Sequence, residues 1–380
     1  MKLLKFDTLY PADYINSKIR DNFSEIQKMS YEEFHKWVIS LRMNFSDFYS
    51  YNLSVHGWDA KEIFLGNRVY LDKCGNRYFG GLFFLYKLFY KIMNKYFLKN
   101  ISLNERLLKK IIKIEKPDVI YVREQSTIRS KFWEQFKDNC LLVSRMDCGI
   151  PKDWSPLSFD LIYTNINSYK DFFEANNIKT LSNSNGFDKR ITDEIQFSTK
   201  IYDITFIGGL GDYYGFVDRT NFYEKLLAEL GNQIKFYWWG YKTGDFDKKY
   251  PLLAKSHRGQ AGGREMFEIY AQSKIVMNDY GVAANGKAVN QRIFEVLGVG
   301  SFLLTRYSES LIDWKDFLDT YNNVEECVEK INFYINNDLV REDIASKGQE
   351  WVLKKYNYRG LLGQISDELI SHYNSKFKIQ

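Results

Sequence analysis

Short apolar runs that alternate with helical segments constrain the fold of this chain more than any other feature. Three runs in the first half, 118–122, 141–144 and 160–163, have the length and composition of buried parallel strands. A helical stretch, Ile128–Lys137, separates the first two. Strands that alternate with helices in this way indicate a doubly wound α/β domain. The same half contains two earlier strand candidates and two further helices: Leu3–Phe6, Ala60–Leu65, Tyr31–Tyr49 with a Ser30/Glu33 capping box, and Asn104–Glu115.

The same alternation begins again after a polar, glycine-bearing stretch at 182–188. A chain of 380 residues is long enough for two domains. We therefore expect an N-terminal Rossmann-like domain over 1–190, a second one over 200–358, and a helix in 359–380 that crosses back to the first. The strands expected in the second domain are 203–207, 234–239, 274–278 and 301–305, and its helices are 221–230, 264–272, 290–297, 324–336 and 339–356.

Composition excludes several classes of protein. The formal net charge of +5 fits an anionic ligand but does not require nucleic acid. The four cysteines show no C-x-x-C spacing, and with four histidines a zinc site is not expected. No P-loop, H-E-x-x-H or G-x-S-x-G pattern occurs, and Gly208-Gly-Leu-Gly211 lacks the dinucleotide-binding spacing. The start of the chain does not have the pattern of a signal peptide, so we expect reduced thiols and a cytoplasmic protein.

One segment, 80–100, is unusually rich in Phe, Leu and Tyr, with lysines at 87, 91, 95 and 99. Those lysines recur every four residues, so they lie along one side of a helix, and Leu82, Leu85, Phe89, Met93 and Phe97 lie along another. Such a helix suits the interface of an anionic membrane, which would make the protein peripheral on the inner face of a membrane. The alternative is a core helix with a solvated basic edge.

Residues 273–305 carry the clearest chemical signal. A buried strand ends at Asn278, a glycine-containing loop follows, and a helix then carries Asn290, Arg292 and Glu295. The free N–H groups of a helix N-terminus, with Lys287 and Arg292 beside them, suit a diphosphate. Glu295 can accept hydrogen bonds from the two hydroxyls of a ribose. The alternative is that Arg292 and Glu295 form an ordinary surface ion pair.

This stretch resembles the C-terminal domain of group 1 glycosyltransferases, especially the spore-maturation (CgeB-like) branch. The residues that carry the resemblance are Asn278, then Asn290-Gln-Arg292-Ile-Phe294-Glu295, then Gly298 to Gly300. Further similarity lies in 203–208, 236–240 and 344–349, so the resemblance covers about 200–360. It implies the GT-B fold, in which two doubly wound domains face one another across a cleft. It also implies transfer of a sugar from a nucleotide-diphosphate donor without a metal or other cofactor, the donor being UDP- or GDP-linked.

The resemblance also implies roles for individual residues. Glu295 would bind the ribose, and Gly208 and Gly209 would allow the backbone to approach the phosphates. Arg292 and Lys287 would contact the diphosphate, with Asn290 in the same motif. Gly240 and Arg258 would flank the base. One departure is that many group 1 enzymes have a second glutamate eight positions before Glu295, where this chain has Lys287. A retaining mechanism copied from those enzymes is therefore in doubt.

A catalytic base must reach the acceptor hydroxyl from the first domain, and carboxylates that follow its strands are the candidates. They are Asp13, Glu124 and Asp147, of which Asp147 in Arg145-Met-Asp147 resembles an acidic residue of the family. Asp147 and Asp13 are the predicted catalytic residues. The alternative for each is a carboxylate that caps a turn.

The sequence thus predicts a glycosyltransferase of cell-surface polysaccharide biosynthesis that acts on a glycan, lipid-linked or protein acceptor, with no nucleic acid partner. Three other functions stay open. They are a nucleotide-sugar epimerase on the same fold, a DNA-modifying glucosyltransferase, and a non-catalytic scaffold that binds sugar or nucleotide.

Overall fold

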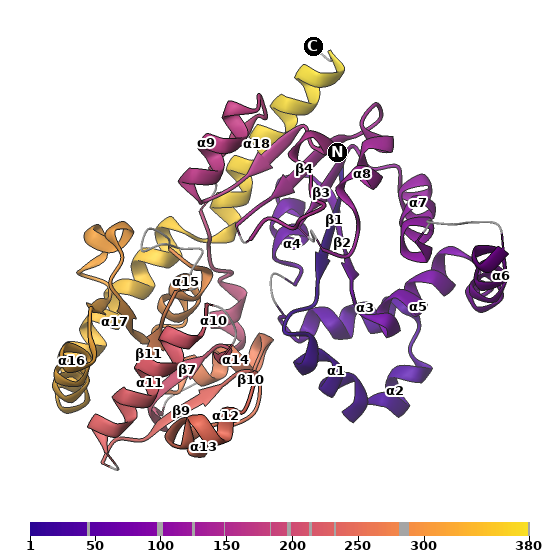
Figure 1. Cartoon of the computed structure of the whole chain (residues 1–380). Coiled ribbons are helices and arrows are strands. Elements are labelled where there is room, and N and C mark those ends of the chain that lie inside the picture. The colour runs from indigo at the N-terminus through magenta and orange to yellow at the C-terminus, as the bar shows by residue number, and fades with distance from the viewer. Residues whose placement is uncertain are drawn as a thin grey trace. The chain divides into compact units, whose positions relative to one another are not determined.

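The computed structural model describes residues 1–43, 46–96, 102–123, 126–147, 149–182, 184–195, 199–212, 215–231, 233–280 and 289–378, with the side chains of 93–96 left out. The chain divides into two compact units (Figure 1). Unit 1 comprises Met1–Asn183 and Leu362–Gln380, and unit 2 comprises Ser184–Leu361.

Unit 1 is built on a parallel sheet with the strand order β2-β1-β3-β4-β5-β6. The chain moves outward from β1 to β2 and then returns to β3 on the other side of β1. The topological switch point of this sheet is therefore between β1 and β3. The strands are β1 (Lys2–Thr8), β2 (Asp59–Leu65), β3 (Val119–Val122), β4 (Leu141–Arg145), β5 (Leu161–Tyr163) and β6 (Thr180–Leu181).

Helices cover this sheet, and their side chains form a hydrophobic core with those of the strands. In this core Phe6 of β1 packs against Trp133, with 5.0 Å between the ring centroids. Figure 1 shows their order along the chain. They are α1 (Ala12–Asp21), α2 (Phe23–Lys28), α3 (Tyr31–Ser40), α4 (Phe48–Ser54), α5 (Arg68–Tyr78), α6 (Phe83–Tyr96), α7 (Leu103–Glu115), α8 (Ser130–Trp133), the 3₁₀ turns Glu134–Phe136 and Pro156–Ser158, and α9 (Asn167–Ala175).

The C-terminal helix α18 (Tyr358–Phe377) packs on unit 1 along most of its length, as Figure 1 shows in yellow. Trp58 Nε1 donates a hydrogen bond to Ser366 Oγ at 2.9 Å, and the hydroxyl of Tyr163 donates to Glu368 at 2.7 Å. Lys376 forms an ion pair with Asp160 at 2.6 Å. These contacts attach α18 to β5 and to Trp58, the residue that precedes β2.

Unit 2 repeats the same plan with an unrelated sequence. Its parallel sheet has the order β13-β12-β11-β7-β9, so the switch point is between β7 and β11. The strands are β7 (Tyr202–Ile207), β9 (Phe236–Trp239), β11 (Ser273–Asn278), β12 (Phe302–Arg306) and β13 (Asp319–Tyr321), with a separate pair formed by β8 (Leu210–Gly211) and β10 (Lys242–Thr243).

The helices of unit 2 pack closely on this sheet and on one another. A Cβ on Gly348 of α17 would lie 2.9 Å from the Leu297 side chain of α15, so the two helices meet where only glycine fits. The helices are α10 (Arg190–Glu194), α11 (Val217–Leu230), α12 (Phe246–Lys249), α13 (Pro251–Ser256), α14 (Gly263–Ala271), α15 (Gln291–Gly298), the 3₁₀ turn Glu309–Trp314, α16 (Val324–Asn336) and α17 (Asp338–Lys355).

The predicted α/β class is confirmed, and each predicted strand is present within two residues of its expected bounds. Two helix predictions were wrong. The stretch 128–137 contains only the short helix α8 and the 3₁₀ turn Glu134–Phe136. The stretch 31–49 contains two helices, α3 and α4, and Arg42 between them has a left-handed φ of 51° that no α-helix continues through. The capping box that opens α3 is present, since Glu33 N donates to Ser30 Oγ at 3.2 Å and Ser30 N to Glu33 at 2.7 Å.

Candidate functional site

The carboxyl ends of β7 and β11 meet at the switch point of unit 2, the position where open α/β sheets bind ligands. Gly208 and Gly209 follow β7 directly, and Asn278 is the last residue of β11. Helix α15 begins at Gln291, so its N-terminus belongs to the segment that returns from β11. The sequence motif and the topology therefore select the same edge of the sheet.

The three predicted glycines of this edge each have close neighbours that leave no room for a side chain. A Cβ on Gly240 would lie 2.0 Å from the carbonyl oxygen of Gly208, and a Cβ on Gly209 would lie 2.6 Å from the ring of Tyr241. The N–H of Gly208 donates to the Trp239 carbonyl at 2.8 Å. A side chain at Gly240 would therefore separate the ends of β7 and β9. Gly208 and Gly240 are partly exposed at this edge, whereas Gly209 is buried.

Arg292 of α15 extends to this edge. Its Nε donates to the hydroxyl of Tyr270 at 2.8 Å, and its guanidinium lies 5.9 Å from the centre of the Phe206 ring. One of its terminal nitrogens lies 3.6 Å from the position that a Cβ on Gly208 would occupy. The hydrogen bond to Tyr270 fixes the plane of the guanidinium beside the glycines, which is the arrangement that bidentate recognition of a phosphate needs.

Asn290, the N-cap of α15, ties the helix to the sheet. Its Nδ2 donates to Asn278 Oδ1 at 3.0 Å, and Asn278 in turn donates to Thr305 Oγ1 of β12 at 2.9 Å. This chain of amide and hydroxyl groups holds the N-terminus of α15 against the carboxyl ends of β11 and β12. Asn290 thus positions the helix that carries Arg292.

Glu295 lies one turn beyond Arg292 and is partly buried. Burial raises the pKa of Glu295 to about 7, although the charge of Arg292 and a hydrogen bond with Gln291 act in the opposite direction. A carboxyl group with a pKa near neutrality carries a proton for part of the time when no ligand balances it. Ribose hydroxyls that donate to Glu295 would favour its ionised form.

Sequence reasoning missed Arg219, on the first turns of α11. Its NH2 donates to the carbonyl of Gly209 at 2.5 Å, and its guanidinium lies 5.5 Å from the Phe206 ring, the same ring that Arg292 approaches. Arg219 is buried, and burial lowers its pKa. The one sequence signal was a basic residue shortly after the glycine-bearing segment, and its burial is a property of the folded unit alone.

A second pair of charges is buried behind this edge. Asp279 is 2% exposed, and its Oδ2 lies 3.7 Å from Nε of Arg306. Burial raises the pKa of Asp279, while Arg306 and Arg219 lower it. Its Oδ1 accepts from Tyr280 N at 2.7 Å, so the carboxylate also shapes the start of the segment after β11.

The remaining predicted donor residues have different outcomes. Arg258 is exposed beside β9, with its guanidinium 4.3 Å over the Tyr237 ring and its NH1 bonded to the carbonyls of Lys255 and His257. Lys287 lies outside the described residues. The structure therefore brings together Gly208, Gly209, Gly240, Asn290 and Arg292, with Glu295 one turn away, and places Arg258 along the outer strand.

Two features concern metals. The sequence contains one Asp-x-Asp triplet, Asp245-Phe246-Asp247, whose Phe246 is buried in the core and whose Asp247 pairs with Lys242 at 2.7 Å. Within the described ranges, no three His, Cys, Asp or Glu side chains are grouped so that they could hold a metal ion.

The predicted catalytic carboxylates belong to unit 1. Asp147 follows β4, where its Oδ1 accepts from Asn165 N at 2.8 Å and its Oδ2 pairs with Nε of the buried Arg145. Both oxygens thus have structural partners, as a turn carboxylate would. Asp13 is exposed on the first turn of α1, and Glu124 lies outside the described residues.

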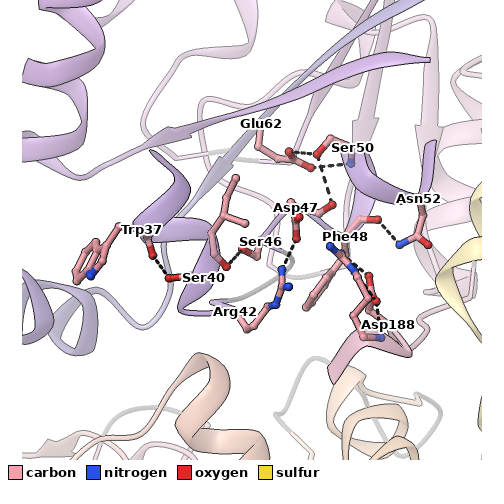
Figure 2. Close-up of polar contacts among 12 residues, drawn as sticks. Trp37, Ser40, Arg42, Ser46, Asp47, Phe48, Ser50, Asn52, Glu62 and Asp188 are labelled. Atoms are coloured by element: carbon pink, nitrogen blue, oxygen red, sulfur yellow. Dashed lines mark hydrogen bonds and ion pairs between the residues drawn. The ribbon is translucent and has the colours of Figure 1, made fainter. Parts of the chain in front are cut away.

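Unit 1 also buries charges near its own switch point. Lys5 of β1 is fully buried and pairs with Asp7 at 2.8 Å. Glu62, its neighbour on β2, accepts hydrogen bonds from the backbone N–H and the hydroxyl of Ser50, as Figure 2 shows. Burial raises the pKa of Glu62 to about 7, against the opposing effects of Lys5 and Ser50. These contacts fix α4 on the sheet.

Comparison with known proteins agrees with this geometry. Residues 219–367 match the model of the family described as "Glycosyl transferase-like". This segment begins at Arg219 and includes Asn290, Arg292 and Glu295. No curated protein is close enough in sequence to count as a relative.

Solved structures resemble the whole chain. A glycosyltransferase from Rickettsia africae ESF-5 aligns with a TM-score of 0.57 at 12% identity, over 100% of this chain and 99% of that one. HepE (Alr3699) from Anabaena, solved with UDP-glucose, aligns with a TM-score of 0.58 at 14% identity, over 98% and 100%. An α,α-trehalose-phosphate synthase (UDP-forming) from Burkholderia vietnamiensis aligns with a TM-score of 0.50 at 11% identity, over 82% and 87%.

At identities this low, the similarity shows a shared fold and no more. That fold is GT-B, as the sequence predicted. The GT-B fold and the glycosyl transferase-like match of residues 219–367 together support a glycosyltransferase. More particularly, the segment that matches the family model contains the predicted donor-site helix, α15.

Proposed function

We propose that the protein binds a UDP- or GDP-linked sugar at the carboxyl edge of β7 and β11 and transfers the sugar without a metal. One observation carries this proposal above the others. Arg292 and the glycine pair at 208–209 lie side by side at the switch point, and Glu295 follows on the same helix. A nucleoside diphosphate requires three elements in its binding site: a cation for the phosphates, a backbone that the phosphates can approach, and a group that accepts hydrogen bonds from the ribose.

In this proposal the basic residues act on the leaving group. When the bond between the anomeric carbon and the diphosphate breaks, negative charge grows on the phosphate oxygens. Arg292, held by Tyr270, and the N-terminus of α15 stabilise that charge more than they stabilise the bound donor. Lys287, which stands four residues before Gln291 in the sequence, is proposed to add a further cation. Arg219 holds the carbonyl of Gly209 and so shapes the phosphate-binding backbone.

The finer parts of the proposal concern the acceptor side. Asp147 or Asp13 serves as the catalytic base, and the acceptor is a glycan, a lipid-linked sugar or a protein. The resemblance of 278–300 to the spore-maturation branch supports a role in cell-surface polysaccharide biosynthesis. HepE binds UDP-glucose in its solved structure, which supports UDP as the first nucleotide to test. We also expect the protein to work in the cytoplasm, in peripheral contact with a membrane.

The experiment that tests this function measures release of the nucleoside diphosphate from UDP- and GDP-sugars by the full chain, with Arg292→Ala and Arg264→Ala as paired variants. Arg264 is a suitable control because it is an exposed arginine of the same unit that pairs with Glu268 at 2.9 Å. We expect slow release from one donor family, loss of release in Arg292→Ala, and no change in Arg264→Ala. Formation of an epimerised nucleotide sugar with no release would instead favour an epimerase.

A further inference from the structure

Helix α6 of unit 1 has two apolar faces, and they differ in what they contact. One face is packed: Phe83 is 2% exposed and lies 5.4 Å from Phe79, and its ring fills the space that a Cβ on Gly75 would need. Tyr86 lies 4.6 Å from Phe79, and Arg106 of α7 lies 5.5 Å over the Tyr90 ring. These contacts fix α6 on α5 and α7 through one side of the helix.

The opposite face carries large apolar residues, each with an exposed fraction above one half. At 100° per residue, positions 84, 85, 88, 89 and 92 form one stripe along the side turned away from Phe83 and Tyr90. The residues of this outer stripe and their exposed fractions are Phe84 69%, Leu85 58%, Leu88 52%, Phe89 60% and Ile92 52%. Single exposed apolar residues are ordinary, but five on one face of one helix mark an interaction surface.

The charge around this stripe indicates which kind of partner it binds. Residues 80–114 contain eight Lys and Arg and one acidic residue, a net charge of +7, whereas the whole chain has +5. The rest of the chain is therefore net negative, at −2. The one acidic residue, Glu105, is buried and pairs with Arg129 at 3.1 Å. The positive charge of the protein is thus concentrated on the segment that carries the stripe.

Basic side chains also line a groove next to α6. It has a volume of about 910 Å³, and Arg106, which packs on Tyr90, is one of its walls. Its other basic residues are Lys109, Arg129 and Lys131, and they outnumber its two carboxylates, Glu105 and Asp153. On α6 itself, Lys91 is exposed and adjoins the stripe, while Lys87 pairs with Asp72 at 2.7 Å. A second copy of this surface would be repelled by its own charge, so a twofold contact through the stripe is disfavoured.

We propose that the outer stripe of α6 inserts into the interface of an anionic lipid bilayer, with Lys91 of α6 and Arg106 and Lys109 of α7 on the lipid headgroups. An apolar face bordered by cations is the pattern of helices that lie in the plane of a membrane. Among the described helices, none is long and apolar enough to cross a bilayer. The inference does not depend on the donor chemistry of unit 2, since every residue that it uses belongs to unit 1.

The test is sedimentation of the full chain with vesicles of neutral phosphatidylcholine, and with vesicles in which about a third of the lipid is anionic phosphatidylglycerol. We expect binding to the anionic vesicles that falls at least tenfold when the salt rises from about 0.05 M to about 0.5 M. Leu85→Ser with Phe89→Ser should lower the bound fraction at least tenfold. Phe172→Ser, at an aromatic residue of α9 that is also about half exposed (51%), should not change it.

Charge is tested separately with Lys91→Glu, which should weaken binding to anionic vesicles, against Lys248→Glu on α12, which should not. Equal melting temperatures and equal nucleotide binding show that each variant is folded. The proposal is overturned if wild type stays in solution at low salt, or if it binds neutral and anionic vesicles equally. It is also overturned if the stripe variants and Phe172→Ser behave alike, or if light scattering shows a dimer that Leu85→Ser with Phe89→Ser converts to monomer.

Discussion

Gly240 and Gly208 lie so close that a methyl group on Gly240 would stand 2.0 Å from the carbonyl oxygen of Gly208. This contact joins the ends of β7 and β9 at the edge where the donor is proposed to bind. Because the clashing atom belongs to the backbone, a side chain at 240 cannot be relieved by a rotamer change. The close approach of two main chains is therefore a requirement of the fold at this edge.

Gly240→Ala should consequently lower the free energy of unfolding by at least about 2 kcal/mol, since the ends of β7 and β9 must separate. Chemical denaturation with intrinsic tryptophan fluorescence measures this, because Trp238 and Trp239 are on β9. The matched variant is Gly149→Ala, where no described atom lies within 4 Å of the added carbon. That variant should change stability by less than about 1 kcal/mol. Equal effects of the two substitutions would contradict the packing argument.

Arg292→Ala should weaken binding of the cognate nucleoside diphosphate by about 10- to 100-fold, the effect expected for charge-assisted hydrogen bonds to phosphate. Arg292→Lys keeps the charge but loses the planar fork and the bond to Tyr270, so its affinity should fall between those of wild type and Arg292→Ala. Isothermal titration calorimetry gives the three affinities. Unchanged affinity in Arg292→Ala, with the melting temperature preserved, would remove Arg292 from the site.

Glu295→Gln should change how stability depends on pH. The pKa of Glu295 is about 7 in the folded protein, above its ordinary value of 4.5, so the folded state holds this proton more tightly than the unfolded state does. Glu295 therefore lowers the stability progressively as pH rises from about 4.5 to about 7. The glutamine variant lacks this loss, so its stability relative to wild type should increase over that window by up to about 3 kcal/mol.

Thermal unfolding of the ligand-free protein at pH 5, 6, 7 and 8 checks this sign. Glu62, whose pKa is also about 7, contributes the same trend to wild type and variant, and it cancels in the difference between them. A difference that stays constant with pH would show that Glu295 is ionised in the folded protein throughout.

The overall plan of the fold could be predicted because it depends on local patterns. Apolar runs of four to six residues between helical segments were sufficient to place β1 to β5 of unit 1 and β7, β9, β11 and β12 of unit 2, and the Ser30/Glu33 capping box marked the start of α3 correctly. The split of 31–49 into two helices could not be predicted. Arg42 adopts a left-handed backbone conformation, and an arginine in the sequence does not indicate that conformation. Edge elements such as β6, with two residues, are too short to leave a pattern.

The candidate site divides in the same way. Arg292 and Glu295 were predicted because they belong to a contiguous motif. The partners that orient Arg292 were not, since Tyr270 is 22 residues away and meets it through the packing of α14 on α15. Arg219 was missed because its importance comes from its burial beside Gly209 and Phe206. The outer stripe of α6 was predicted in part: Leu85 and Phe89 are exposed as expected, while Met93 and Phe97 lie outside the described side chains.

Asp147→Asn tests the proposed catalytic base of unit 1. If Asp147 takes a proton from the acceptor, turnover should fall by at least about 100-fold, with the affinity for donor unchanged. Asp160→Asn is the matched control, since Asp160 also accepts a backbone N–H, that of Leu142 at 2.8 Å, and pairs with a cation, Lys376. Equal losses in the two variants would identify Asp147 as a structural carboxylate that holds Arg145. Wild-type turnover in Asp147→Asn would also contradict the catalytic assignment.

The central claim is that unit 2 binds a nucleoside diphosphate through Arg292 and Glu295, and a thermal-shift panel tests it most directly. UDP, GDP, ADP, CMP and the UDP- and GDP-sugars are compared on wild type and on Glu295→Ala. A ligand at about 100 times its dissociation constant adds about 2.7 kcal/mol of apparent stability. We predict that one nucleotide family raises the melting temperature of wild type and that the shift is lost in Glu295→Ala. A well-folded wild type that none of these ligands stabilises would contradict the account and favour a scaffold that has kept the fold without the donor site.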